Sequence, residues 1–157
     1  MAINMAINKN IRNEDLIKMF IEKAIFLKNY ESTQSLIDNN IHSYNTAKSV
    51  ASEIEKILKQ LISSEEGVYL FVKLLSDKNI AVAASAAEFL YPMYPKKCIK
   101  ILKRYSKSLN NKLDRYKVDC KIEGLEHQNE IFLKTYKKLY GCDDLDSLNQ
   151  EKGTNKE

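Results

Sequence analysis

Cationic side chains are concentrated in one segment of this 157-residue chain. From Lys96 to Lys121 there are ten basic residues and only two acidic ones, so the segment carries a net charge of +8. Lysines spaced at i, i+4, i+7 and i+11 lie along one side of a helix. Such a stripe can bind a phosphate backbone or an acidic protein surface. The lysine stripe consists of Lys96, Lys100, Lys103 and Lys107, and it is flanked by Lys97 and Arg104.

Three interpretations of the lysine stripe are open at this point. It is a solvated face that keeps the protein in solution, a surface for an acidic protein partner, or a surface for nucleic acid. Only three of the 25 basic residues are arginine, which is the usual residue for bidentate contacts with phosphate and guanine. Tyr105 and Tyr116 are the aromatic residues nearby. We therefore rank nucleic acid below a protein partner.

The residue types that support catalysis or metal binding form no convincing motif. His127 shares a helical face with Glu123 and Glu130, and one histidine with two glutamates can hold a metal ion. A solvated helical face is the preferred interpretation. The acidic cluster at residues 142–146 lacks the glycine and the terminal glutamate of a calcium loop. No glycine-rich phosphate loop or nucleophile elbow is present. We expect no enzymatic activity, no metal and no cofactor.

The composition is that of a globular protein, with 44% hydrophobic and 29% charged residues. No apolar run reaches the ~20 residues that a membrane-spanning helix needs. The N-terminus lacks the basic segment and long apolar core of a secretory signal. Cys98, Cys120 and Cys142 are an odd number without paired spacing, which indicates reduced thiols. We expect a cytoplasmic protein.

Helical periodicity, together with only 4 Gly and 2 Pro, predicts an all-α chain of about six helices. Asn13 is the predicted N-cap of the first helix, and the second is expected from residue 32 or 33 to residue 62. Further helices are expected to start after Ser64, after Asn79 and at Pro95. A last helical region runs to Gly141, with a bend or break at Gly124. The predicted organisation is an N-terminal arm (1–12), one domain (13–141) and a disordered acidic tail (142–157).

The fourth predicted helix and the turn before it resemble part of a known helical repeat. Residues 77–82, DKNIAV, and residues 86–90, AAEFL, are similar to a HEAT-type repeat, which has an acidic turn, a valine, paired alanines and a leucine. The sequence departs from that pattern at Ala83 and Ala84, where the family usually has arginine. From residue 13 to residue 141 the layout also resembles a small, uncharacterised bacterial family of HEAT-like single domains. The segments that carry this wider resemblance are NEDLI at 13–17, EEG at 65–67 and LYG at 139–141.

The resemblance implies a compact, right-handed HEAT-like array and an extended surface that binds another macromolecule. We expect a non-enzymatic protein-binding module, and a specific version is an immunity or antitoxin-type protein that neutralises its partner by occlusion. The alternative is a nucleic-acid-binding HEAT-like protein that uses the basic residues of segment 96–121. A third hypothesis is a homo-oligomeric domain in which the long second helix pairs with its copy.

Overall fold

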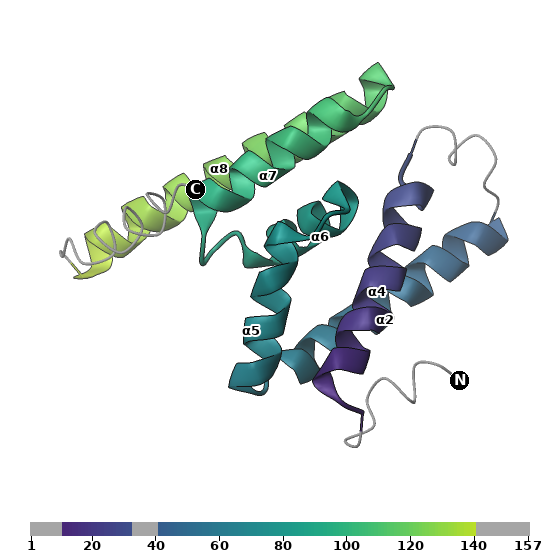
Figure 1. Cartoon of the computed structure of the whole chain (residues 1–157). Helices are drawn as coiled ribbons and strands as arrows, with labels where there is room; N and C mark the ends of the chain where they lie inside the picture. Colours follow the sequence, from purple (N-terminus) through teal and green to yellow (C-terminus); the bar gives the residue numbers. More distant parts are fainter. Residues whose placement is uncertain (1–10, 33–40, 141–157) are drawn as a thin grey trace. The chain divides into compact units, whose positions relative to one another are not determined.

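The computed structural model describes residues 11–32 and 41–140. Within these residues it contains six α-helices, one short 3-10 helix and no strand (Figure 1). The prediction of an all-α fold with about six helices is therefore confirmed. Most of the predicted N-terminal arm, the first part of the predicted second helix, Gly141 and the predicted acidic tail lie outside the described residues.

The chain divides into two compact units, residues 1–85 and residues 86–157. The boundary falls inside helix α6 (Ile80–Leu90), so each unit contains part of that helix. The predicted limits of one domain at residues 13 and 141 stay a prediction, as does the right-handed HEAT-like arrangement.

The first unit is built on the packing of α2 (Asn13–Tyr30) against α4 (Ile41–Leu61) and α5 (Glu65–Lys73). Phe20 of α2 meets Phe71 of α5 edge-on, with ring centroids 5.0 Å apart and an interplanar angle of 89°. This is a favourable geometry for two aromatic rings. Lys23 of α2 and Glu53 of α4 form an ion pair at 2.6 Å. The core of this unit includes Leu16, Phe20, Ala24, Ile54, Ile57, Leu61 and Phe71.

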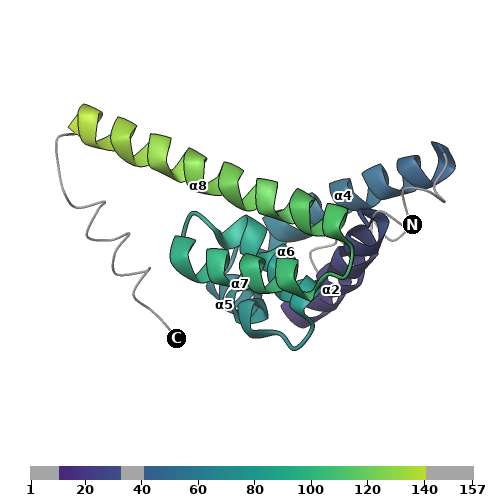
Figure 2. The ribbon, with the colours of Figure 1, turned by 90° about the horizontal axis from the view of Figure 1, so that it is seen from above.

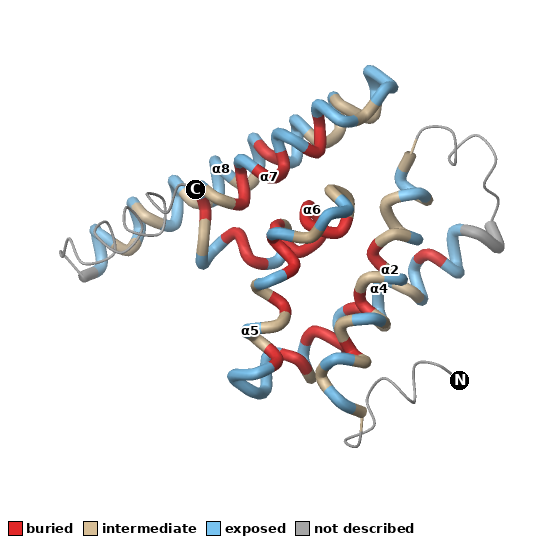
Figure 3. The backbone as a smooth tube through the Cα atoms, in the orientation of Figure 1, coloured by how far each residue is buried: buried red, intermediate tan, exposed pale blue. Residues whose placement is uncertain are grey.

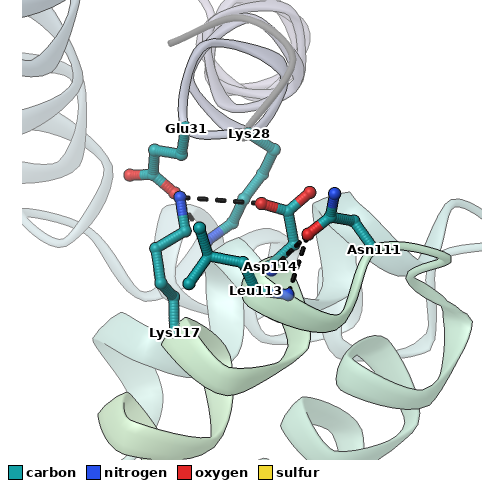
Figure 4. Close-up of polar contacts among 6 residues, drawn as sticks. All are labelled: Lys28, Glu31, Asn111, Leu113, Asp114 and Lys117. Atoms are coloured by element: carbon teal, nitrogen blue, oxygen red, sulfur yellow. Dashed lines mark hydrogen bonds and ion pairs between the residues drawn. The ribbon is translucent and has the colours of Figure 1, made fainter. Parts of the chain in front are cut away.

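The start of α2 corrects one prediction. Arg12, and not Asn13, occupies the N-cap position, and its side chain makes no capping hydrogen bond. The Asn13 amide instead donates to Glu66 Oε1 at 2.9 Å and to Ser64 Oγ at 3.3 Å. Asn13 therefore ties the start of α2 to the start of α5, a long-range contact that spacing along the sequence does not reveal. At the other end of α2, Lys28 pairs with Glu31 at 3.7 Å (Figure 4).

Heptad-like spacing predicts an inner seam at Ile37, Ile41, Tyr44, Ala47, Ala51, Ile54, Leu58 and Leu61, and helix α4 buries most of its described part. Ala47, Ile54, Leu58 and Leu61 are buried as expected. Tyr44 and Ala51, which belong to the same predicted seam, are exposed. Ile57 is fully buried although it lies outside that seam. The inner face therefore follows the 3.6-residue period of a packed helix and not a strict heptad.

The start signals at Ser64 and Asn79 are confirmed. Ser64 Oγ accepts the Gly67 amide at 3.0 Å and caps α5. Asn79 Oδ1 accepts the Ala81 amide at 2.9 Å at the start of α6. Between these helices, the 3-10 helix η1 (Leu74–Ser76) ends at Asp77.

The sequence pattern predicts an inner face of α6 at Val82, Ala83, Ala86, Ala87 and Leu90, and more of the helix than this face is buried. Every residue from Val82 to Ala87 is buried, including Ala83, Ala84 and Ser85 (Figure 3). A helix that is apolar on all sides belongs in a core. The sequence departs from the HEAT-type pattern at Ala83 and Ala84, and both residues are at most 1% exposed to solvent. No arginine side chain fits at either position without displacing its neighbours.

The second unit continues with α7 (Pro95–Ser108) and α8 (Lys112–Tyr140), which pack on each other. Pro95 occupies the first turn of α7, as predicted. Ser106 of α7 donates to Asp119 of α8 at 2.8 Å. Asn111 caps α8 by accepting the amides of Leu113 and Asp114 at 2.8 and 3.1 Å (Figure 4). A bend or break was predicted at Gly124, and α8 continues through that residue without a break.

Candidate binding face of helix α7

Helix α7 presents a cationic face to solvent. All six of its charged residues are basic, and no acidic residue occurs between Pro95 and Ser108. The side of the helix that carries Cys98, Ile101 and Leu102 is buried, which anchors it. The basic face is exposed at Lys96, Lys100, Lys103, Arg104 and Lys107, and half-buried at Lys97.

The charges at the start of α7 oppose the helix dipole. Lys96 and Lys97 lie in the first turn, and that turn contains no acidic residue. The N-terminus of a helix carries a partial positive charge, so each cation there costs about 0.3–1 kcal/mol. Helices α2 and α5 follow the opposite rule, since each has two acidic residues in its first turn. The first turn of α7 therefore attracts anions, and it does so at the expense of helix stability.

Three basic residues of α8 are engaged within the second unit. Arg115 Nη1 donates to the Leu109 carbonyl at 2.7 Å. Lys117 pairs with Asp114 at 3.6 Å (Figure 4), and Lys121 pairs with Glu88 at 3.4 Å. The +8 segment is therefore not a uniform surface. Arg115, Lys117 and Lys121 on α8 contribute to the fold, whereas the basic residues on α7 form the exposed cationic face.

The two aromatic residues near the lysine stripe differ in their availability. Tyr105 is buried in the core face of α7 and cannot stack on a base. Tyr116 of α8 is 65% exposed. A side-chain hydrogen bond with Cys120 raises the pKa of Tyr116 above its ordinary value. The cationic face of α7 itself therefore presents no aromatic platform.

The cysteines have no arrangement that would make a nucleophile. Cys98 is fully buried, and burial raises the pKa of its thiol to about 12 despite the opposing effect of Lys97. Cys120 is exposed. Cys142 lies outside the described residues, together with the rest of the acidic cluster at 142–146.

His127, singled out for its position beside two glutamates, is exposed on α8. Its Nδ1 lies 4.0 Å from Glu130 Oε1, and both side chains are about two-thirds exposed or more. Within residues 11–32 and 41–140 no three histidine, cysteine or acidic side chains are grouped so that they could hold a metal ion. In the same part of the chain no helix combines the length and the apolar character needed to cross a membrane.

Sequence analysis missed one surface. The second half of α8 exposes large apolar side chains, including Phe132 and Leu139, which are 56% and 70% exposed. Their seven-residue spacing is visible in the sequence and is typical of a helix that packs against another helix. The surfaces predicted for binding were the lysine stripe and the long second helix, and this part of α8 was not among them.

Comparison with protein-family models, curated proteins and solved structures gives no match for this chain.

Proposed function

We propose that this protein is a non-enzymatic binding module that recognises an acidic surface of a protein partner through the cationic face of α7. The observation that carries the proposal is the set of six basic residues on α7 without an acidic neighbour in the same helix. Opposite charges that meet across an interface accelerate association and select the partner. The buried side of α7 supports a rigid presentation of these charges.

The first turn of α7 adds to this argument. Lysines at a helix N-terminus do not favour the folded state, whereas an acidic partner would interact with both their charge and the dipole. A face that served only to keep the protein soluble would not need cations at that position. A specific version of the proposal is an immunity or antitoxin-type protein that blocks its partner by occlusion. The small size of the chain and the lack of a catalytic motif support that version.

Nucleic acid is the alternative ligand of the same face. Arginine is scarce, and the one aromatic residue on α7, Tyr105, is buried. Both observations favour a protein partner over single-stranded nucleic acid, which usually stacks its bases on exposed aromatic rings. Binding of a phosphate backbone would also weaken steeply with salt, with a slope set by the number of contacts.

The test is capture of partners from nuclease-treated native lysate, with the wild type and two variants compared in one experiment. The stripe variant replaces Lys96, Lys100, Lys103 and Lys107 with Gln. The matched control makes the same change at four exposed lysines of the first unit, Lys48, Lys56, Lys59 and Lys78. Both variants lose the same net charge. We expect the wild type and the control to retain a stoichiometric acidic protein, and the stripe variant to lose it.

Equal retention of that protein by the stripe variant would contradict the proposal. Recovery of no protein, with nucleic acid co-purifying when the nuclease is omitted, would establish the alternative. If a protein partner is recovered, its binding to the wild type and to both variants should be measured as a function of salt concentration.

A further inference from the structure

Helix α8 extends well past the helix that packs on it. It has 29 residues, whereas α7 has 14. At 1.5 Å per residue these lengths are about 43 Å and 21 Å. Only residues 109–111 connect the two helices, so α7 runs back along the first half of α8 and leaves the second half uncovered by it (Figures 1 and 2).

One seam runs along both halves of α8. Its members are spaced alternately by four and three residues, which is the heptad spacing of a helix that packs against another helix. In the first half the seam is covered, and Ile122 is only 4% exposed. In the second half it opens, since Phe132 and Leu139 are more than half exposed. The seam consists of Val118, Ile122, Leu125, Asn129, Phe132, Tyr136 and Leu139.

The open part of the seam has the features of a helix-pairing surface. The rings of Phe132 and Tyr136 lie 6.2 Å apart, one turn from each other. A large apolar surface that stays exposed marks an interaction site.

The charged residues around this seam are separated by sign along the helix, with acidic residues first and basic residues last. Acidic residues come first along this part of α8, at Glu123, Glu126 and Glu130. Basic residues follow toward its end, at Lys134, Lys137 and Lys138. Two such segments that run in opposite directions bring acidic residues beside basic ones at both ends. Two segments that run in the same direction bring like charges together. The helix dipoles also favour the antiparallel arrangement.

We infer that the segment from Leu125 to Leu139 is a self-association surface, which pairs antiparallel with the same segment of a second copy of this chain. Leu125, Phe132 and Leu139 supply the apolar contacts. The opposed acidic and basic halves set the direction. This surface is separate from the cationic face of α7. The inference therefore does not depend on the proposed function.

The first test is sedimentation of the full chain over a wide range of concentrations. We expect a reversible monomer–dimer equilibrium for the wild type. The variant that combines Phe132→Ser and Leu139→Ser should raise the dimer Kd about tenfold or more, since each tenfold step corresponds to only 1.4 kcal/mol. Both side chains are exposed, so circular dichroism should show an unchanged helix content in the monomer.

Ile131→Ser is the matched control for the apolar contacts. Ile131 is 51% exposed and adjoins Phe132 in sequence, but it does not belong to the seam. Its substitution should leave the dimer Kd unchanged. A wild type that stays monomeric at every concentration would overturn the inference. So would a dimer that Phe132→Ser with Leu139→Ser does not weaken, because association would then use another surface, such as α4.

Substitutions that reverse charge test whether the two helices pair antiparallel. Replacing Glu126 and Glu130 with Lys, or Lys134 and Lys138 with Glu, should weaken the dimer in either case. The fourfold variant that combines both changes should restore it, since opposite signs again face each other. Parallel pairing predicts no loss in the twofold variants, so an unchanged Kd in both would overturn the antiparallel assignment.

Discussion

Gly67 lies where the start of α5 comes close to the end of α4. A β-carbon at this position would overlap the carbonyl group of Leu61, which is backbone and cannot rotate away. The Ser64 hydroxyl accepts the Gly67 amide and holds this close approach in place. The glycine is therefore required by packing, in a turn of the helix where most residues would otherwise be tolerated.

Gly67→Ala should lower the free energy of unfolding by about 2 kcal/mol or more, because the backbone of one helix must shift. The matched control is Gly124→Ala. A β-carbon at Gly124 meets nothing within 4 Å, and alanine favours a helix interior by about 0.5–1 kcal/mol over glycine. Urea unfolding followed by circular dichroism measures both. Equal effects of the two substitutions would show that the close approach at Leu61 is not maintained in solution.

The buried thiol of Cys98 makes stability depend on pH in the alkaline range. Burial raises its pKa from 9.0 to about 12 in the folded state. Because the folded state holds this proton more tightly, the resulting stability is fully present below pH 9 and is lost as the pH rises toward 12. Cys98→Ala removes the titrating group.

The stability difference between the wild type and Cys98→Ala should therefore shift against the wild type by about 1 kcal/mol between neutral pH and about pH 10. Urea unfolding of both proteins at the two pH values measures the shift. A constant difference would contradict a protonated, buried thiol.

In alkylation at mildly alkaline pH, exposed Cys120 should react and Cys98 should stay protected until the protein unfolds.

At the scale of the element, α7 combines a stable inner face with an unfavourable first turn. Lys96→Glu reverses a charge at the positive end of the helix dipole, and the new carboxylate would lie one turn before Lys100. We expect the substitution to stabilise the protein by about 0.3–1 kcal/mol. It should weaken binding of the acidic partner at the same time.

Thermal unfolding and partner titration of the same variant separate these two effects. Lys78→Glu, an exposed lysine outside α7, is the charge-matched control and should change neither property strongly. A Lys96→Glu variant that binds its partner as tightly as the wild type would remove the first turn of α7 from the interface.

The helices themselves were largely predictable from local signals. Ser64 and Asn79 cap their helices as expected, and Pro95 begins α7, because each signal acts through backbone amides only a few residues away. Asn13 was predicted as a cap but contacts Ser64 and Glu66 instead. Its role depends on a neighbour that is distant in the sequence, and no local pattern contains that information.

The candidate site was predictable in part for the same reason. Helical spacing placed the lysine stripe on one exposed face of α7. It did not reveal that Arg115, Lys117 and Lys121 are engaged in α8, since their partners are fixed by tertiary packing. The excess of basic residues in segment 96–121 therefore overstated the surface that a partner can use.

At the scale of the whole molecule, the chain consists of two compact units whose boundary lies within α6. The first unit contains a core closed by Phe20 and Phe71. The second contains both candidate surfaces, the cationic face of α7 and the open seam of α8. Both surfaces proposed for recognition therefore lie in the second unit.

The burial of every residue from Val82 to Ala87 in α6 has a consequence for how this sequence can diverge. Between Val82 and Ala87 any larger side chain meets neighbours on all sides, so substitutions there are restricted to residues about as small as alanine or serine. The outward positions of α8 face no such restriction. In a distant relative we therefore expect this block of small residues to persist after most of the surface has changed, and it is the segment by which an ancestral connection would be detected.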